Sequence, residues 1–194
     1  MEKTKRKVNL VQLFSFALLG LLTIEVVLLI KQNNELRAAL GGQAAIDPLK
    51  SGEEVEPIKI RTLDGNFSEL NYKDPSREYL LFILSTTCPH CESNLPIWGK
   101  INAGKKNANC DVLGVSIHGL EDTKQYAASK NVPFYLVSVA EDTSFHRKYK
   151  IAGVPETILI TGTGRVRKAW FGELSSEQAS EIQALMGVQE SLAN

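Results

Sequence analysis

The sequence predicts an α/β domain, with a mixed central β-sheet flanked by helices, behind one N-terminal transmembrane helix. Three observations lead to this prediction. Residues 8–30 form a long segment that is almost entirely apolar. Beyond residue 57, apolar strand-like segments alternate with amphipathic helix-like segments, which is the pattern of an α/β fold. Two cysteines, Cys88 and Cys91, stand where one of these strands gives way to a helix.

Residues 8–30 are long enough to cross a membrane. At a rise of 1.5 Å per residue, a helix of this length spans about 35 Å, against a hydrocarbon core of about 30 Å. Four basic residues lie between positions 3 and 7, whereas only Lys31 and Arg37 follow closely. The positive-inside rule then places residues 1–7 in the cytoplasm and the rest of the chain across the membrane. The apolar run exceeds the roughly 7–15 residues of a signal peptide, and no small-residue cleavage site follows it, so we expect an uncleaved anchor.

Residues 31–57 are predicted to form a tether, because glycines and prolines interrupt any regular element there. Three glutamates near its end, Glu53, Glu54 and Glu56, are interpreted as a solvated acidic patch. Residues 58–190 then form one globular domain of ordinary length. The chain carries 22 basic and 22 acidic residues, a balance that gives no indication of nucleic-acid binding. Its three cysteines are too few for a disulfide scaffold.

The expected elements of the domain begin with a short edge strand over residues 58–63, which ends in an Asp64-Gly65 turn. Residues 77–84 are an apolar run, as in a central strand buried on both faces. The helix after the cysteines covers residues 92–103. The later elements are a strand over 112–117, a helix over 122–130 opened by a capping box at Asp122, a strand over 134–139, a short helix over 142–149, a hairpin of 157–161 and 166–171, and a last helix capped by Ser175 and ended by Gly187.

The stretch Cys88-Pro89-His90-Cys91 is the strongest functional signal in the chain. A strand that turns directly into a helix places Cys88 at the helix N-terminus, where unpaired N–H groups and the helix dipole stabilise a thiolate. Pro89 falls at the first helical position, where its missing N–H costs nothing. Because a thiolate is the nucleophile of thiol–disulfide exchange, the motif predicts a redox dithiol. Cys88 is the expected nucleophile, and Cys91, three residues further into the helix, is the expected resolving thiol.

A zinc site and an inert pair of buried cysteines are the alternatives to a redox dithiol. Zinc requires four ligands, but the only further cysteine is Cys110, and the histidines show no ligand spacing. The histidines are His90, His118 and His146. We therefore expect no metal ion and no other cofactor. Cys110 begins an apolar strand and is interpreted as a buried small hydrophobic residue.

Several features together resemble the thioredoxin fold: the cysteine motif at a strand-to-helix turn, Pro96 eight residues after the first cysteine, and residues 149–155 before a hairpin. The resemblance covers roughly residues 58–187. It implies that the Val154–Pro155 bond is cis and lies against the active disulfide, as a specified feature. It also implies that the backbone of Val154 and Pro155 pairs with an extended substrate segment, a form of strand addition.

Residues 153–160, Gly-Val-Pro-Glu-Thr-Ile-Leu-Ile, together with the anchor, are similar to the TlpA/ResA group and to the cytochrome c biogenesis thiol-disulfide oxidoreductases. MauD-like proteins and general redoxin-domain proteins share this plan. The similarity implies a membrane-anchored thiol-disulfide oxidoreductase that reduces disulfides of exported proteins, for example apocytochrome c. It implies a transmembrane electron donor of the DsbD/CcdA type, and a catalytic domain in the periplasm or extracytoplasmic space.

Two positions depart from the pattern of these families. Thr86-Thr87 stand where a tryptophan commonly precedes the first cysteine, and Phe82 replaces the buried aspartate of thioredoxin. Deprotonation of the second cysteine therefore requires another base. Glu156, next to the expected cis-proline, is the candidate proton relay by family analogy. Glu121 and Asp122 are weaker candidates and are interpreted as surface carboxylates.

Three other functions are weighed against disulfide reduction. The Pro89-His90 pair also occurs in strongly oxidising DsbA-like proteins, because an imidazole that stabilises the thiolate makes the disulfide more oxidising. A disulfide oxidase or isomerase is therefore the main alternative. A peroxiredoxin would have a proline at the position of Leu81, and a Sco-type copper protein would have CxxxC and a later histidine, but none follows His146. The anchor and residues 153–157 favour a reductase.

Overall fold

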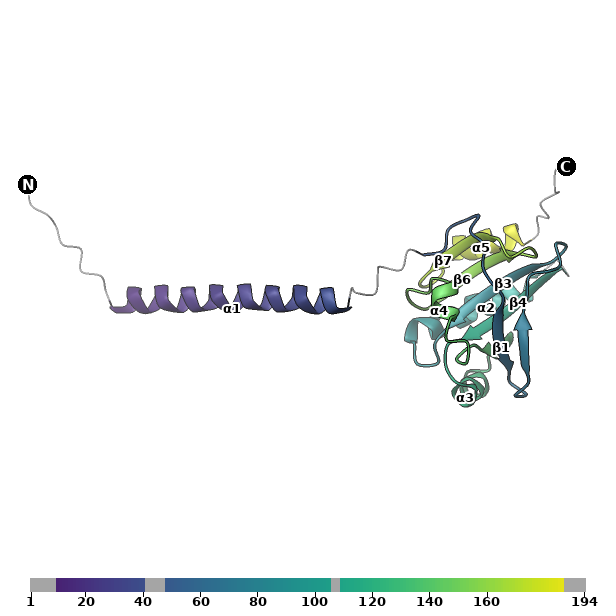
Figure 1. Cartoon of the computed structure of the whole chain (residues 1–194), viewed down its shortest axis with the longest axis horizontal. Helices are drawn as coiled ribbons and strands as arrows, with labels where there is room; N and C mark the ends of the chain where they lie inside the picture. The colour runs from purple at the N-terminus through teal and green to yellow at the C-terminus, as the bar shows by residue number, and fades with distance from the viewer. Residues whose placement is uncertain (1–9, 41–47, 106–108, 187–194) are drawn as a thin grey trace, which may run out of the picture. The chain divides into compact units, whose positions relative to one another are not determined.

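The computed structural model of the chain falls into two compact units (Figure 1) and describes residues 10–40, 48–105 and 109–186. The first unit contains one helix, α1 (Leu10–Leu40). Within α1, the segment Phe14–Asn33 is long and apolar enough to cross a membrane. This finding is compatible with the predicted single-pass anchor over residues 8–30. The helix continues beyond that anchor, into the segment that was expected to be a tether.

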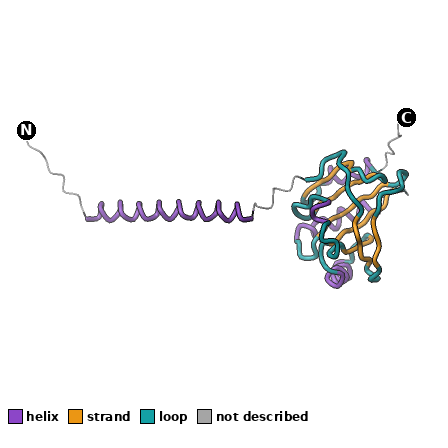
Figure 2. The backbone as a smooth tube through the Cα atoms, in the orientation of Figure 1, coloured by secondary structure: helices purple, strands orange, loops and turns teal. Residues whose placement is uncertain are grey.

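The second unit is built on a seven-stranded sheet with the order β2-β1-β5-β4-β3-β6-β7. Its strands are drawn in orange in Figure 2. The strands are β1 (Ile58–Thr62), β2 (Phe67–Leu70), β3 (Glu78–Leu84), β4 (Cys110–Ser116), β5 (Tyr135–Ser138), β6 (Glu156–Thr161) and β7 (Val166–Phe171). Strands β3, β4 and β5 are parallel, whereas β6 and β7 on one side and β1 and β2 on the other are antiparallel to their neighbours. The predicted mixed sheet is confirmed.

Strand β3 lies at the centre of the core, because its side chains are buried on both faces of the sheet. On one face Leu80, Phe82 and Leu84 pack with three helices. On the other face Leu81 and Ile83 pack with a fourth, short helix. The three helices of the first face are α2 (Pro89–Ala103), α3 (Leu120–Lys130) and α5 (Ser176–Leu185), and the short one is α4 (Phe145–Lys148). This continuous burial explains why an unbroken apolar run identified β3 from the sequence.

Strand β2 was not predicted, and as a result the position of β1 was predicted wrongly. Residues 58–63 were expected to form an edge strand, but β1 pairs with both β2 and β5. The edge strand is β2, in which Phe67, Ser68 and Glu69 are all exposed and only Leu70 is buried. A strand with one buried side chain lacks the alternation by which strands are recognised.

The start of α3 also differs from the prediction. The helix begins at Leu120 with Gly119 as its N-cap, and no side chain caps it, so the capping box expected at Asp122 is wrong. Thr123 is instead fully buried and donates its hydroxyl to the carbonyl oxygen of Gly119 at 2.8 Å. A capping box is present where it was predicted at the start of α5, between Ser175 and Gln178. Gly187, its predicted stop, lies outside the described residues.

The predicted tether over residues 31–57 is wrong at both ends. Its first part belongs to α1, and residues 48–57 belong to the domain. Leu49 and Val55 are buried in the core, and the backbone of Val55 donates to the carbonyl oxygen of Gly164 at 2.8 Å. Residues 41–47 lie outside the described residues.

The three glutamates of this segment each pair with a cation of the domain, and the side chains of Glu54 and Glu56 remain mostly exposed to solvent, as predicted. Glu53 accepts hydrogen bonds from the Lys150 ammonium at 2.9 and 3.0 Å. The other two pairs are Glu54 with Arg165 and Glu56 with Lys148. We call residues 48–57 the strap, since it is held on the domain by core packing, backbone bonds and these ion pairs.

Helix α2, which begins directly after Cys88, is fixed to the rest of the domain by buried polar and aromatic contacts. Trp98 stacks on Phe82 with ring centroids 4.9 Å apart, and its indole N–H donates to Thr157 Oγ1 at 3.0 Å. Asn94 is buried, donates to the carbonyl oxygen of Gly172 at 3.1 Å and accepts from the Leu174 N–H at 2.8 Å. The helix therefore has a defined position relative to both β6 and the loop before α5.

Asn94→Ala is expected to lower the free energy of unfolding by about 2 kcal/mol, because it leaves the buried N–H of Leu174 without its acceptor. Denaturant unfolding of the full-length protein, followed by tryptophan fluorescence, measures this change. Ser93→Ala is the matched control, since Ser93 is exposed on the same helix and is expected to change stability by less than about 0.5 kcal/mol. Equal effects of the two substitutions would contradict this role of Asn94.

Candidate functional site

Cys88 lies at the junction of β3 and α2, as the sequence predicted. It is the N-cap of α2, with extended backbone, and Pro89 occupies the first turn. The carbonyl oxygen of Cys88 accepts the N–H of Cys91 at 3.1 Å and that of Glu92 at 3.3 Å. Its side chain is only partly buried. Cys88 therefore combines access from outside with a position at the N-terminal end of a helix dipole.

Cys91 differs sharply from Cys88 in its surroundings. Its side chain is fully buried, in the same cluster as Leu84, Leu95 and Trp98. Burial, opposed by a hydrogen bond of the Ser85 backbone and aided by the adjacent Cys88 side chain, raises the pKa of Cys91 to about 12. Both cysteines are free thiols, so this is the dithiol form of the pair.

The segment before β6 faces the cysteines. The Val154–Pro155 peptide bond is cis, and the Cys88 thiol donates to the carbonyl oxygen of Val154 at 3.7 Å. The carbonyl oxygen of Pro155 accepts the N–H of Gly172 at 2.9 Å, which ties this segment to the end of β7. The chain thus brings residues 66 positions apart into direct contact at the sulfur of Cys88.

Glu156 is the first residue of β6, next to Pro155, and it is fully buried. It pairs in register with Ile83 of β3 and Phe171 of β7. Among the described residues, neither of its carboxylate oxygens has a hydrogen-bond partner. Burial raises the pKa of Glu156 to about 8. A carboxyl group in this state holds a proton at neutral pH and releases it just above.

His90 projects from the first turn of α2 and is exposed. Its Nδ1 lies 2.6 Å from Glu173 Oε1, in the loop between β7 and α5. The other two carboxylates that were considered as bases, Glu121 and Asp122, are both exposed on α3, as expected for surface groups. Glu121 also pairs with Lys124 at 3.2 Å.

A group of residues beside the cysteines received no role in the sequence analysis. His118 Nε2 lies 3.0 Å from the hydroxyl of Ser85, and that hydroxyl also lies 3.1 Å from Thr87 Oγ1. These residues belong to the ends of β3 and β4, which are parallel neighbours, so the pairing of the strands brings them together. The sequence signal was weak: Thr86-Thr87 were noted only for replacing a tryptophan, and His118 only as a possible metal ligand.

Cys110 lies far from this site, since it begins β4 opposite Glu78 at the start of β3, whereas Cys88 follows the end of β3. It is fully buried, and burial raises its pKa to about 12, so it is the small hydrophobic residue that was expected. Among the residues that the structure describes, no group of three or more histidine, cysteine, aspartate or glutamate side chains is placed to hold a metal ion.

Comparisons with known proteins identify the family of the chain. The family model described as Redoxin matches residues 50–185. Thiol-disulfide oxidoreductase ResA of Halalkalibacterium halodurans is 24% identical over 148 residues, which cover 76% of this chain and 78% of ResA.

Solved structures show the same fold. The thioredoxin domain of a thiol-disulfide oxidoreductase from Bacteroides vulgatus has a TM-score of 0.60 at 22% identity, covering 71% of this chain and 99% of that one. A peroxiredoxin-like protein from Aquifex aeolicus has a TM-score of 0.58 at 16% identity, covering 71% and 88%. Similarity to both kinds of protein identifies the fold rather than the chemistry, which depends on the cysteine pair.

The family match extends over more than half of the chain, and it includes both cysteines, the Val154–Pro155 bond and Glu156. The protein therefore belongs to the Redoxin family and is a thiol-disulfide oxidoreductase of thioredoxin fold, homologous to ResA.

Proposed function

We propose that this protein is anchored in the cytoplasmic membrane by α1 and reduces disulfides of exported proteins outside it, through dithiol–disulfide exchange at Cys88 and Cys91. The observation that carries the proposal is the unequal pair of thiols, an accessible Cys88 at a helix N-terminus and a buried Cys91 one turn behind it. Four basic residues lie close together before α1, and no comparably dense group of basic residues follows it. This asymmetry supports a cytoplasmic N-terminus.

The exchange proceeds in two steps. The Cys88 thiolate attacks one sulfur of the target disulfide, a mixed disulfide forms, and the second target sulfur leaves as a thiolate. Cys91 then loses its proton and attacks the sulfur of Cys88. The Cys88–Cys91 disulfide forms and the target leaves with two thiols, so two electrons pass from the pair to the target. The backbone at Val154, which contacts Cys88, and at the adjacent Pro155 is the proposed pairing site for the target segment.

Glu156 is the proposed proton acceptor for Cys91. The buried Cys91 thiol has a pKa of about 12 and ionises too rarely at neutral pH to attack without a base. Glu156 has a pKa of about 8 and lies next to Pro155, so its carboxylate form is available close to neutral pH. This match between the pKa of a base and the working pH is the condition for efficient general base catalysis.

The pair must be reduced again after each turnover. A transmembrane dithiol donor of the DsbD/CcdA type is the proposed partner, since a reductase outside the membrane needs electrons from inside. Similarity to ResA and to the cytochrome c biogenesis group makes apocytochrome c one candidate substrate among exported proteins with disulfides.

A second candidate function is disulfide oxidation or isomerisation, favoured by His90 within the motif. Imidazolium charge near Cys88 would stabilise the thiolate and make the disulfide more oxidising. Equilibration with glutathione separates the two functions. A potential close to the roughly −270 mV of thioredoxin supports a reductase, and one close to the roughly −120 mV of DsbA supports an oxidase.

The assignment of the two sulfurs predicts different behaviour of two variants. Cys91→Ser should accumulate dithiothreitol-sensitive adducts with exported proteins, because the mixed disulfide on Cys88 cannot be resolved. Cys88→Ser should accumulate few or none, since the remaining Cys91 is buried. Non-reducing electrophoresis of trapped cell extracts measures both, and Cys110→Ser is the control that keeps the pair intact. Adducts of equal amount in the two variants would show that the roles are wrong.

Glu156→Gln is expected to slow the resolving step by at least about tenfold at pH 8, since general bases typically contribute about 10²–10⁴-fold. In the wild type the rate should rise as the pH passes about 8 and then level, as the carboxylate forms. In the variant the rate of the resolving step should continue to rise with the hydroxide concentration. Rapid-quench measurement of mixed-disulfide decay gives both profiles, and identical profiles would exclude Glu156 as the base.

The same variant has an independent signature in stability. Below about pH 4.5 the carboxyl group is protonated in both folded and unfolded states, and between about 4.5 and 8 only the unfolded state releases the proton. The wild type should therefore lose stability relative to Glu156→Gln by about 1.4 kcal/mol per pH unit in that window, and no further above it. A pH-independent difference would mean that Glu156 is not the buried acid described here.

The proposed orientation predicts where Cys88 reacts. In intact cells that express a Cys110→Ala variant, a membrane-impermeant thiol reagent should label Cys88 after mild reduction. A variant that lacks both Cys88 and Cys110 is the control, because Cys91 is buried and should react slowly. Labelling that requires cell lysis would refute the orientation.

A further inference from the structure

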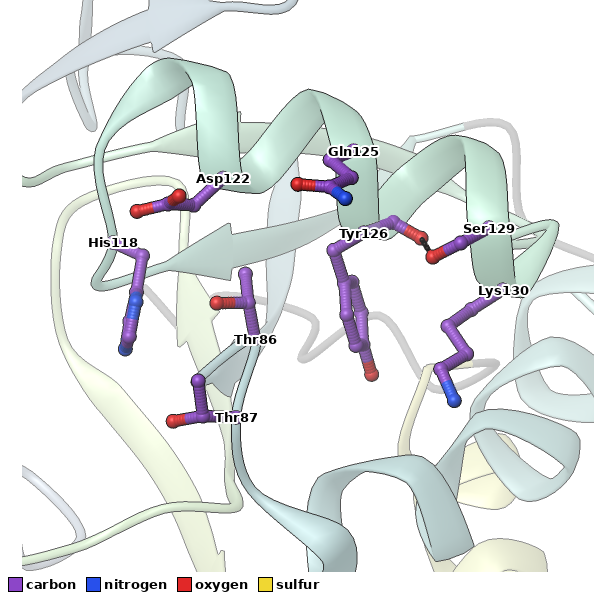
Figure 3. Close-up of a pocket in the computed structure, with 8 residues that line it drawn as sticks. All are labelled: Thr86, Thr87, His118, Asp122, Gln125, Tyr126, Ser129 and Lys130. Atoms are coloured by element: carbon purple, nitrogen blue, oxygen red, sulfur yellow. Dashed lines mark hydrogen bonds between the residues drawn. The ribbon is translucent and has the colours of Figure 1, made fainter.

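An open pocket of about 520 Å³ lies beside the active cysteines, between the residues that precede Cys88 and one face of α3 (Figure 3). Each of its lining residues carries at least one polar side-chain atom. The lining residues are Thr86, Thr87, His118, Asp122, Gln125, Tyr126, Ser129 and Lys130. Because Thr87 is the immediate neighbour of Cys88, any polypeptide whose disulfide reaches Cys88 passes close to this pocket.

Tyr126 indicates that the pocket is built to hold a polar group. Its side chain is 4% exposed, and Figure 3 shows its ring directed into the space between Thr87 and Lys130. Among the described residues, the Tyr126 hydroxyl has no hydrogen-bond partner. Burial raises the pKa of Tyr126 to about 12, so the phenol stays protonated and can both donate and accept a hydrogen bond. A buried hydroxyl without a partner is costly, and a polar ligand at this site would satisfy it.

The charges around the pocket are compensated at one end only. Lys130 forms an ion pair with Glu92 at 2.7 Å. Asp122 lies at the opposite end of the pocket, on the side of His118 (Figure 3), and within the described part of the chain its carboxylate has no hydrogen-bond or ion-pair partner. The neighbouring Glu121, by contrast, is paired with Lys124 and does not line the pocket. The pocket therefore offers one free negative charge surrounded by hydroxyl and amide acceptors.

We infer that this pocket is a specificity subsite that binds a basic side chain, lysine or arginine, of the substrate polypeptide near the cysteine that Cys88 attacks. An ammonium or guanidinium group carries only donors, three or five N–H bonds, and needs acceptors in that number. The Asp122 carboxylate, the threonine hydroxyls and the carbonyl oxygen of Gln125 supply them. The inference rests on the proposed exchange at Cys88, and it specifies which polypeptides are exchanged fastest.

The test uses the full-length reduced protein and short peptides that each contain one CxxC disulfide. A single lysine, glutamine or glutamate is placed at each of three positions before and after the disulfide, and kcat/KM is measured for every peptide. At one or more positions, lysine should raise kcat/KM over glutamine by about three- to tenfold, and glutamate should lower it, as expected for a charge-assisted contact that is partly exposed.

Variants on α3 assign the preference to the pocket. Asp122→Asn should abolish the advantage of lysine, and Asp122→Arg should reverse it in favour of glutamate. Glu121→Gln is the matched control: it removes the same charge one position away, on an exposed residue outside the pocket, and should keep the preference. Because Asp122 is exposed, none of these changes should alter folding.

Two results would overturn the inference while leaving the proposed function intact: equal kcat/KM for all peptides, or a lysine preference that Asp122→Asn retains. A loss of the preference in Glu121→Gln to the same extent would also overturn it, since general surface charge would then be the cause. If the wild type reduces none of the peptides, the proposed function is refuted, and the inferred subsite is refuted as well.

Discussion

The activity of this protein depends on one constraint, the fixed position of the α2 N-terminus at the end of β3. Strand β3 is buried on both faces, so its end cannot shift without disturbing the two clusters of the core. Helix α2 is held against the sheet by the Phe82–Trp98 stack and by the bonds of Asn94 to the loop before α5. The contact between Cys88 and Val154 is the product of these distant packing contacts. In the proposed exchange, these packing contacts keep Cys88 beside the backbone that would pair with the substrate.

Burial has the same effect on the protonation of two further groups near Cys88. Cys91 and Glu156 are both fully buried, and for both of them burial favours the protonated form. A buried carboxyl without a hydrogen-bond partner stabilises nothing in the fold, because its desolvation is not offset. Its place next to Pro155 is compatible with the proposed role in proton transfer.

The features that could be predicted from the sequence are local ones. The buried strand β3, the cysteine pair at a helix N-terminus and the capping box at Ser175 each depend on residues close together in the chain. What was missed depends on long-range contacts or on exposed residues. Three side chains of strand β2 are exposed to solvent. Glu53 binds Lys150, which lies 97 positions later in the sequence. The pocket is invisible in the sequence because its walls come from the end of β3, the end of β4 and the face of α3, which only the sheet brings together.

The strap contacts the chain that leads into the segment with Val154. The Tyr149 hydroxyl donates to the carbonyl oxygen of Glu56 at 3.1 Å, and Lys150, which has a left-handed backbone with φ of 48°, is bound by Glu53. These two residues come directly before the segment that carries Val154. A non-glycine residue in this conformation is held by its surroundings rather than by its own preference. The strap supplies part of that support, so residues 48–57 belong with the domain rather than with a tether.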